Sequence, residues 1–200
     1  MKYSQSASSA GFKDTVHDSQ ACFRLLMDAF SYPALAHDFP ARACAWGAMP
    51  ASIVTLLLTL ADQDTPVWFD QPYADDDEVR ACVAFHCGAP VVAQTDRAAF
   101  AFISDPARIG DFSRFMSGDP DFPDRSTTVV VQAGGINTGS LMFTGPGIRE
   151  PQGFGADGLL SDFVAQWRRN RRSFPLGLDL IFVNETKVVA LPRSLRLQEV

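Results

Sequence analysis

Lysine is scarce in this sequence, and its scarcity argues against one large class of enzyme. Enzymes that use pyridoxal phosphate bind the cofactor through a lysine Schiff base. The chain has only Lys2, Lys13 and Lys187. The first two lie in a loose N-terminal stretch rich in small residues, and the third begins a predicted terminal strand. We therefore expect no pyridoxal phosphate, and no other cofactor, in this protein.

Common signatures of catalysis are also missing. The sequence contains no G-x-x-x-x-G-K-[ST] phosphate loop, no G-x-S-x-G nucleophile elbow and no H-E-x-x-H zinc motif. A self-sufficient nucleotide hydrolase or dehydrogenase of a common type is therefore not expected, and we assign no catalytic residue.

No apolar run is long enough to cross a membrane. The longest, residues 53–61, is interrupted by Thr55 and Thr59 and is far shorter than the roughly 20 residues of a spanning helix. The first eleven residues lack the apolar core of a secretory signal. We expect a cytoplasmic protein that does not bind membranes.

Cysteine pairs of the kind found in metal knuckles or redox motifs are absent. Cys22, Cys44, Cys82 and Cys87 form no C-x-x-C motif, and most of their neighbours are apolar. Buried free thiols in a reducing compartment are therefore the preferred interpretation.

Positive charge is in deficit, with 17 Lys and Arg against 23 Asp and Glu and a net charge of −6. Nucleic-acid binding needs a basic face, so we expect none. Four arginines nevertheless cluster after Trp167: Arg168, Arg169, Arg171 and Arg172. They could grip a polyphosphate through bidentate contacts, or complement the end of a helix and remain in water. The second interpretation is favoured, and the sequence leaves the question open.

The chain has 200 residues, 46% of them hydrophobic, which suits one domain spanning residues 1–200. We expect residues 1–14 to be a loosely ordered N-terminus and residues 15–195 to form the fold. The predicted helices and strands alternate along the chain. This alternation predicts an α/β fold with a mixed sheet flanked by helices.

Apolar spacing and turn residues place the predicted elements. Helices are expected from Asp18 or Ser19 to Pro33, over 50–61, from Asp75 to Gly88, after Asp105-Pro106, and around 160–167. The third should carry four carboxylates, 75–78, in its first turn, and the fourth should face Ile109, Phe112, Phe115 and Met116 inward. Strands are expected at 67–69, 99–103, 127–132, 141–143, 179–183 and 187–191.

Two strand relationships follow from these patterns. The run 129–131 is apolar on both faces, which predicts a central strand, and we expect 141–143 to be its neighbour. The last two strands are predicted to form a hairpin around Asn184.

Asp62 and Asp64 bracket a tight turn after the most apolar helix. Paired carboxylates there can hold Mg²⁺ or act as acid and base. Aspartate is also common in such turns because its side chain bonds to nearby backbone N–H groups. We favour the turn role.

Cys82 and His86 lie four residues apart on a predicted helix, a spacing that can present two metal ligands. No further ligand is near in sequence, so we expect a core thiol, a histidine at a helix end, and no metal site. His86 remains a candidate because the helix end and the following Gly88-Ala89-Pro90 often border a cleft.

Five stretches together are more specific than any of these motifs: 20–27, 56–68, 85–90, 143–148 and 174–181. Within them, LLTLADQDTPVW (57–68) and FPLGLDLI (174–181) are the most distinctive. In this order they resemble the PhnH family, the H subunit of the carbon–phosphorus lyase core complex. The resemblance runs from about Ser19 to Arg193. Ala34 departs from it, because the family commonly has glycine there, and the four-arginine run is not part of the pattern.

The resemblance implies a fold similar to a reduced large domain of pyridoxal-phosphate-dependent transferases, without the cofactor lysine. It also implies a homodimer when alone, and assembly with the G, I and J subunits. That assembly supports formation of α-D-ribose 1-methylphosphonate 5-triphosphate from ATP and a phosphonate, with release of adenine. The chemistry is attributed to the I subunit, and the later carbon–phosphorus cleavage to the J subunit.

The leading hypothesis is therefore an accessory subunit without its own catalytic centre. One alternative is a small transferase for a phosphorylated small molecule, with Arg24, Asp62, Asp64 and His86 in one cleft; another is a purely structural dimer. The candidate residues for ligand binding or assembly are Arg24, Asp62, Asp64, His86 and Asp179.

Overall fold

The structure, a computed structural model, describes residues 11–198. Its α-helices are α2 (Thr15–Ser31), α3 (Ala51–Leu60), α4 (Gln71–Ala74), α5 (Asp77–His86) and α6 (Phe163–Arg172). Its strands are β1 (His37–Asp38), β2 (Val67–Phe69), β3 (Phe100–Ile103), β4 (Thr128–Gln132), β5 (Ile136–Thr144), β6 (Gln152–Ala156), β7 (Asp179–Val183), β8 (Lys187–Leu191) and β9 (Arg196–Leu197). Four 3₁₀ turns connect them: η1 (Thr95–Arg97), η2 (Pro106–Arg108), η3 (Phe112–Arg114) and η4 (Pro123–Arg125). The expectation of a loose N-terminus falls mostly on residues 1–10, which lie outside the described residues.

A six-stranded mixed sheet forms the centre of the fold, in the order β1-β8-β7-β4-β3-β2. Strands β2, β3, β4 and β7 run parallel, whereas β8 pairs antiparallel with β7, and β1 with β8. The α/β class and the mixed sheet are thus confirmed. The terminal hairpin and the central position of β4 are confirmed as well, because β4 lies between β3 and β7.

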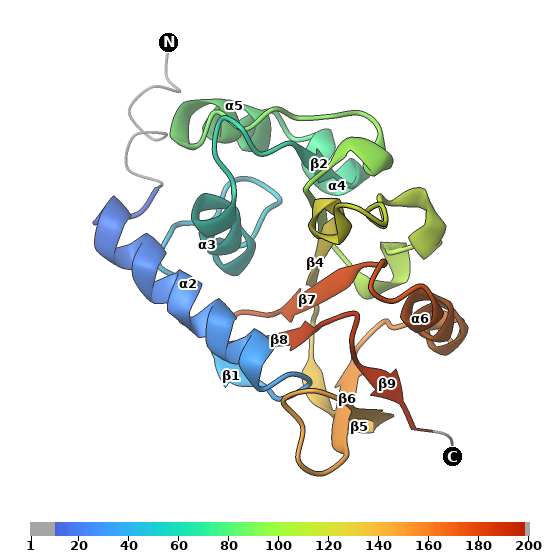
Figure 1. Ribbon diagram of the computed structural model, residues 1–200. Helices are drawn as coiled ribbons and strands as arrows, with labels where there is room; N and C mark the ends of the chain where they lie inside the picture. The colour runs from blue at the N-terminus through green and yellow to red at the C-terminus, as the bar shows by residue number, and fades with distance from the viewer. Residues whose placement is uncertain (1–10, 199–200) are drawn as a thin grey trace.

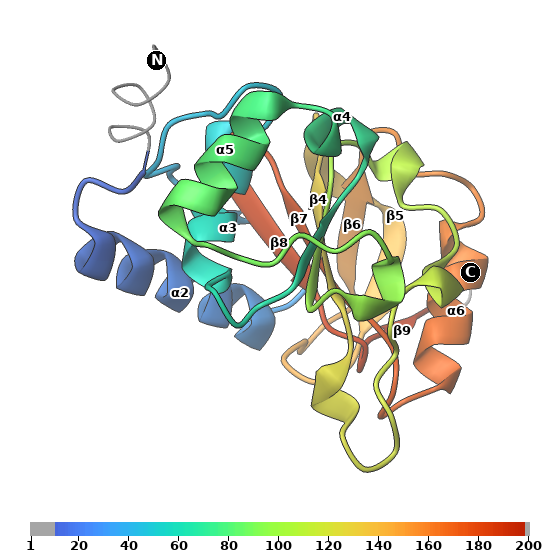
Figure 2. The same ribbon diagram turned by 90° about the horizontal axis from the view of Figure 1, so that it is seen from above.

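The two faces of the sheet support separate apolar layers. Phe102, Val130 and Ile181 share one face and pack with residues of α2, α3 and α5. Their neighbours in sequence point the other way, since strand side chains alternate, and pack with α6 and the second sheet. Figure 1 shows α2, α3 and α5 on one side of the sheet and α6 on the other, and Figure 2 shows the same separation from above.

The second sheet has three strands in the order β6-β5-β9. The expectation that 141–143 would lie beside the central strand is wrong, because these residues belong to β5 of this second sheet. Both edges of β4 are already occupied by parallel strands. Most of β5 is incompletely buried, with only Phe143 fully buried, which suits the outer layer.

The expected starts of two helices are also corrected. α2 begins after Asp14, whose Oδ1 accepts a hydrogen bond from the His17 N–H at 3.0 Å, and not at Asp18 or Ser19. α5 begins after Asp76, and Asp75 instead follows α4. Each helix begins directly after its capping aspartate. The side chain of that aspartate accepts hydrogen bonds from backbone N–H groups two or three residues further along the chain.

Residues 105–116 do not form the single helix that was expected. They form the two short turns η2 and η3, separated by Gly110 at φ +65°. That left-handed conformation interrupts a helix. The predicted inward positions of Ile109, Phe112 and Phe115 are confirmed, whereas Met116 is 42% exposed.

The cysteines are free thiols, but they are not all buried. Cys22 and Cys82 are buried, Cys87 is half-buried and Cys44 is exposed, so the expectation for Cys44 is wrong. Cys44 lies in an irregular stretch before α3, where apolar neighbours in sequence do not define a buried face.

Ala34, the departure from the family pattern, adopts φ +60°. Its N–H donates to the Ala190 carbonyl at 2.9 Å, which attaches the turn after α2 to β8. This position therefore keeps a conformation that favours glycine although the residue is alanine.

Candidate functional site

The paired aspartates after α3 have a structural environment. Asp62 Oδ1 accepts hydrogen bonds from the Asp64 N–H at 3.0 Å and from Thr65 Oγ1 at 2.6 Å. These bonds, above all the one from Thr65, hold the pKa of Asp62 below its usual value. Both aspartates are exposed. The bonds are those expected of an aspartate that stabilises a turn.

His86 ends α5 and packs against an aromatic ring. Its imidazole stacks on Trp46, with the ring centroids 5.2 Å apart and the planes at 14°, and Phe85 contacts it edge-on. Cys82, one turn earlier, points into the core. Within residues 11–198, no three or more His, Cys, Asp or Glu side chains are grouped as metal ligands.

Asp179, at the start of β7, binds Arg193. The Arg193 Nε lies 3.1 Å from each carboxylate oxygen, and the Arg193 backbone N–H donates to Oδ1 at 2.7 Å. The same guanidinium donates to the Pro123 carbonyl at 2.8 Å and to Ser126 Oγ. Asp179 thus fixes one arginine that joins the start of β7 to η4.

Arg24 is exposed on the outer face of α2. The candidate residues therefore lie on α2, in the turn after α3, at the end of α5 and at the start of β7. None of them lines the cavity described next.

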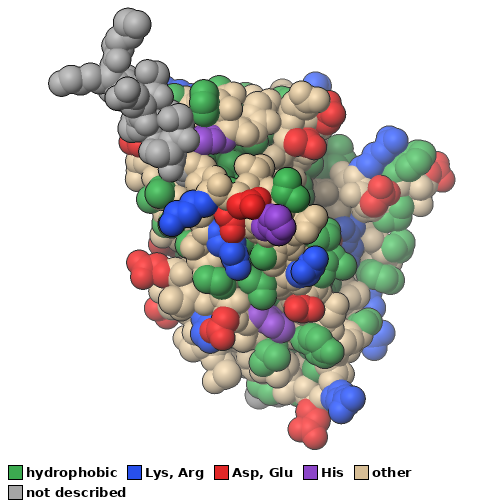
Figure 3. Space-filling view, turned by 90° about the vertical axis from the view of Figure 1, so that its left-hand side faces the viewer, with side chains coloured by type: hydrophobic (Ala, Val, Ile, Leu, Met, Phe, Trp, Pro, Cys, Tyr) green, Lys and Arg blue, Asp and Glu red, His purple; other side chains and the backbone are tan. Residues whose placement is uncertain are grey.

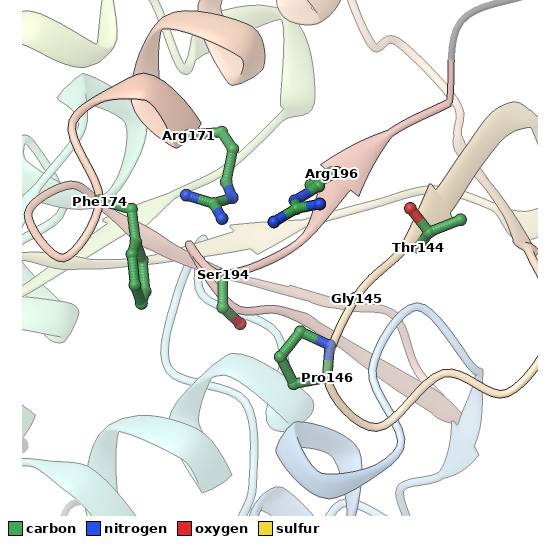
Figure 4. A pocket seen from close by; sticks show the side chains of 7 residues that line it. All are labelled: Thr144, Gly145, Pro146, Arg171, Phe174, Ser194 and Arg196. Atoms are coloured by element: carbon green, nitrogen blue, oxygen red, sulfur yellow. The ribbon is translucent and has the colours of Figure 1, made fainter.

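The arginine pocket is a cavity of about 430 Å³ between the end of α6 and the second sheet. Its lining residues come from three segments: Thr144, Gly145, Pro146, Arg171, Phe174, Ser194 and Arg196. Figure 4 shows the guanidinium groups of Arg171, from α6, and Arg196, from β9, pointing toward one another. The pocket thus brings together a glycine turn, two cations, two hydroxyls and one aromatic ring.

Strand pairing sets one wall of this pocket. β9 lies beside β5 with Thr144 opposite Arg196, so the arginine is placed next to the end of β5. Gly145 follows at φ +144°, and a Cβ there would lie 3.1 Å from the Leu195 side chain. Glycine is therefore needed for the chain to turn this closely past the segment before β9.

Arg171 differs from the other members of the four-arginine run. It is half-buried, whereas Arg168, Arg169 and Arg172 are exposed. Its guanidinium carbon lies 4.7 Å from the centroid of the Phe174 ring. Its Nε is buried and has no hydrogen-bond partner within residues 11–198.

The lining of the arginine pocket suits binding and not covalent catalysis. Arginine forks recognise anions, and the hydroxyls of Thr144 and Ser194 can donate further hydrogen bonds. A serine or threonine nucleophile needs an adjacent base, and within residues 11–198 no histidine, carboxylate or lysine lines the pocket.

A polar network lies at the carboxyl ends of the parallel strands, where ligands often bind in α/β folds. Asp70 Oδ2 accepts from the Ser104 N–H at 3.0 Å, Ser104 Oγ at 2.6 Å and Arg108 Nε at 2.9 Å. The Tyr73 hydroxyl donates to Gln132 at 2.6 Å, and burial raises the pKa of Tyr73. These bonds join the ends of β2, β3 and β4.

One glycine pattern has the spacing of a dinucleotide-binding loop, G-x-G-x-x-G at residues 153–158. That motif functions between a parallel strand and the start of a helix. Here it lies in β6 and the turn after it, in the antiparallel second sheet. The pattern therefore lacks the structural context that would give it this role.

Comparison with known proteins identifies the family. Residues 10–198 match the family described as bacterial phosphonate metabolism protein (PhnH). The chain belongs to the PhnH family. The match covers all seven residues of the arginine pocket and every candidate residue named from the sequence.

Two curated relatives of this PhnH-family chain carry more specific names. The chain is 35% identical over 191 residues, 95% of each chain, to the alpha-D-ribose 1-methylphosphonate 5-triphosphate synthase subunit PhnH of Rhizobium meliloti (strain 1021). It is 29% identical over 176 residues, 88% of this chain and 83% of the relative, to the putative C-P lyase subunit protein HtxG of Stutzerimonas stutzeri.

The sequence identified some members of the PhnH-family pocket and missed others. Arg171 was singled out, but as one of four similar arginines. Arg196, Ser194 and Phe174 were not, because they meet Arg171 through tertiary packing and the β5–β9 pairing. Two of the family-like stretches, 143–148 and 174–181, do contribute pocket residues, and they were the available signal.

Among residues 11–198, no helix combines the length and the apolar character needed to cross a bilayer.

Proposed function

We propose that this chain is an accessory subunit of a cytoplasmic, multi-subunit transferase that forms α-D-ribose 1-methylphosphonate 5-triphosphate from ATP and a phosphonate. The observation that carries the proposal is the 35% identity to a subunit of that synthase over 95% of both chains. Nearly full-length similarity supports a role for the whole fold in the same assembly.

The contacts of the candidate residues support an accessory role. Asp62 and Asp179 are engaged in a turn and with Arg193, and His86 stacks on Trp46. The arginine pocket holds hydroxyls but no base to activate them. In this proposal the reaction centre belongs to companion subunits, the I subunit for this step, and the chain contributes binding surfaces.

The proposal includes no pyridoxal phosphate. We infer that the fold is related to the large domain of pyridoxal-phosphate-dependent transferases and acts without the cofactor. In support, Lys187 Nζ lies 2.7 Å from Asp38 in an ion pair at the surface, and Lys13 is exposed before α2. A Schiff-base lysine needs a cofactor pocket around it.

The outer face of α2 supports self-association. Val16, Phe23 and Met27 recur along one face of the helix and are 61%, 50% and 51% exposed. Figure 3, which views the side of the molecule on which α2 lies in Figure 1, shows hydrophobic side chains mixed with charges of both signs. Exposed apolar residues among mixed charges are typical of protein interfaces.

The occupant of this face is proposed to be a second copy of the chain when the companions are absent. Arg24 and Asp28 flank Phe23 and Met27, and neither pairs with an opposite charge within residues 11–198. Two antiparallel copies of α2 related by a two-fold axis bring Arg24 of each chain toward Asp28 of the other. In this arrangement the charges of the two copies are complementary, and the G, I and J subunits are proposed to bind the assembled protein.

The direct test is affinity purification of the tagged chain from cells that co-express the G, I and J subunits. The expected result is recovery of all three in fixed stoichiometry, and growth on methylphosphonate that requires the chain. Recovery of the chain without companions, together with normal growth in its absence, would contradict the proposal.

A further inference from the structure

The arginine pocket holds two cations for which residues 11–198 provide no ion-pair partner. Neither Arg171 nor Arg196 lies within an ion pair among residues 11–198. Among the residues that the structure describes, no carboxylate lines the cavity. Arg171 is half-buried and Arg196 is exposed, so their facing guanidinium groups make the open side of the pocket positively charged and able to attract an anion from solution.

Some arginines of the chain have carboxylate partners. Arg42 lies 2.9 Å from Asp18, Arg108 lies 2.9 Å from Asp70, and Arg193 binds Asp179. The buried Nε of Arg171 has no acceptor within the described residues, a property that it shares with Arg114 Nε, which lies outside this pocket. A buried donor without a partner is unfavourable, and an acceptor oxygen placed in the pocket would remove that cost.

A helix-capping role does not account for Arg171. A cation in the last turn of a helix can bind the terminal carbonyl groups. Among residues 11–198, however, those carbonyls receive backbone N–H groups, with Ser173 donating to Asn170 and Phe174 donating to Arg171. The Arg171 side chain instead lies over the Phe174 ring, beside the cavity.

We propose that the arginine pocket binds the phosphoryl group of a small organic phosphate. Two guanidinium forks and the hydroxyls of Thr144 and Ser194 match the several acceptor oxygens of a phosphate, whereas a carboxylate offers only two. The Phe174 ring and Pro146 offer apolar contact to the carbon skeleton of the ligand. The volume, about 430 Å³, lies in the range of roughly 300–1,000 Å³ of small-molecule sites.

The choice of probe rests on the proposed function, which assigns the chain to an assembly whose product is a phosphorylated ribose. Ribose 5-phosphate is titrated into the purified chain by calorimetry, with ribose and inorganic phosphate as comparisons. The expected result is saturable binding of ribose 5-phosphate, weaker binding of inorganic phosphate and none of ribose. Equal affinity for inorganic phosphate, or no binding of ribose 5-phosphate, would overturn the inference.

Variants locate the site. Arg171→Gln and Arg196→Gln are each expected to weaken ribose 5-phosphate binding about tenfold or more, because each removes a charged donor. Arg168→Gln, from the same arginine run but exposed outside the pocket, is expected to stay within about twofold. Unchanged affinity in the Arg171→Gln/Arg196→Gln double variant would refute the site. If Arg171→Gln lowers the melting temperature of the free protein, Arg171→Lys and Arg196→Gln still test it.

Failure of the pocket proposal can be distinguished from failure of the proposed function. Ribose 5-phosphate binding is measured on the chain alone, and assembly is measured by co-purification. Arg196→Gln removes one side chain of the pocket, so it should lose the ligand and still recover the companion subunits. If the wild-type chain bound ribose 5-phosphate but did not recover the companion subunits, the subunit role would be rejected and the proposed ligand site would stand.

Discussion

Arg193 and Asp179 form a hydrogen-bonded ion pair, in which the arginine Nε lies 3.1 Å from both carboxylate oxygens of the aspartate. Their side chains are 14% and 17% exposed. Asp179 belongs to a family-like stretch and was a candidate for ligand binding or assembly. Its contacts assign it a structural role, because they join β7 to η4 through one guanidinium.

Asp179→Ala is expected to lower the free energy of unfolding by about 3 kcal/mol, because it leaves a mostly buried arginine without its counter-charge. The Asp179→Leu/Arg193→Met double variant should lose less than the single variant, since no charge is then left unpaired. Urea denaturation measures both. Wild-type stability of Asp179→Ala together with lost growth on methylphosphonate would indicate a functional role instead.

Asp76 should make stability depend on pH in the acid range. Hydrogen bonds from the backbone N–H groups of Ala48, Val79 and Glu78 hold the pKa of Asp76 below its usual 3.8. The ionised form is therefore favoured in the folded state, so its contribution is complete above about pH 4 and is lost as pH falls through the lower, folded pKa.

Asp76→Ala is expected to cost about 1 kcal/mol at neutral pH through loss of the helix cap. The difference from wild type should shrink below pH 4. Asp75→Asn removes a neighbouring carboxylate that does not cap α5, and its effect should stay within about 0.5 kcal/mol. A constant Asp76→Ala deficit from pH 7 to pH 2 would show that the charge of the cap is unimportant.

The α2 face can be tested by charge reversal. Arg24→Asp should weaken the proposed homodimer by placing like charges opposite each other, and Arg24→Asp/Asp28→Arg should restore it. Phe23→Asp should yield monomers by sedimentation equilibrium. Phe85→Asp, at an exposed aromatic residue on α5, is the control and should remain dimeric. A Phe23→Asp variant that remains dimeric would exclude this face.

Thiol reactivity should distinguish the four cysteines. Burial raises the pKa of the Cys22, Cys82 and Cys87 thiols, which reduces the reactive thiolate, whereas Cys44 is exposed. An aromatic disulfide reagent should therefore modify Cys44 rapidly, the half-buried Cys87 more slowly, and Cys22 and Cys82 only on unfolding. Cys44→Ser should abolish the rapid phase. A rapid phase that persists in Cys44→Ser would contradict this order of reactivity.

Local signals in the sequence were sufficient for much of the fold. The apolar stretch after Pro50 gave α3, the run at 129–131 gave the central β4, and Asn184 marked the terminal hairpin. Each depends on residues close in sequence. The predicted neighbour of β4, residues 141–143, was wrong. Strand order is decided by contacts between segments that are distant in sequence, and local periodicity does not encode those contacts.

The candidate site was less predictable for the same reason. Asp62 was favoured as a turn residue, and its contact with Thr65 agrees. Arg171 could not be distinguished from Arg168 in sequence, since only the packing of Phe174 and β9 separates a half-buried arginine from an exposed one. Arg196 gave no signal, because its importance arises from the pairing of β9 with β5.

Adenine release from ATP and methylphosphonate tests the central claim most directly. Purified chain alone, the G, I and J subunits without it, and the complete mixture are assayed side by side. The account predicts no release by the chain alone, and full release only when it is added to its companions. Turnover by the isolated chain would contradict it, because the reaction centre would then lie within these 200 residues.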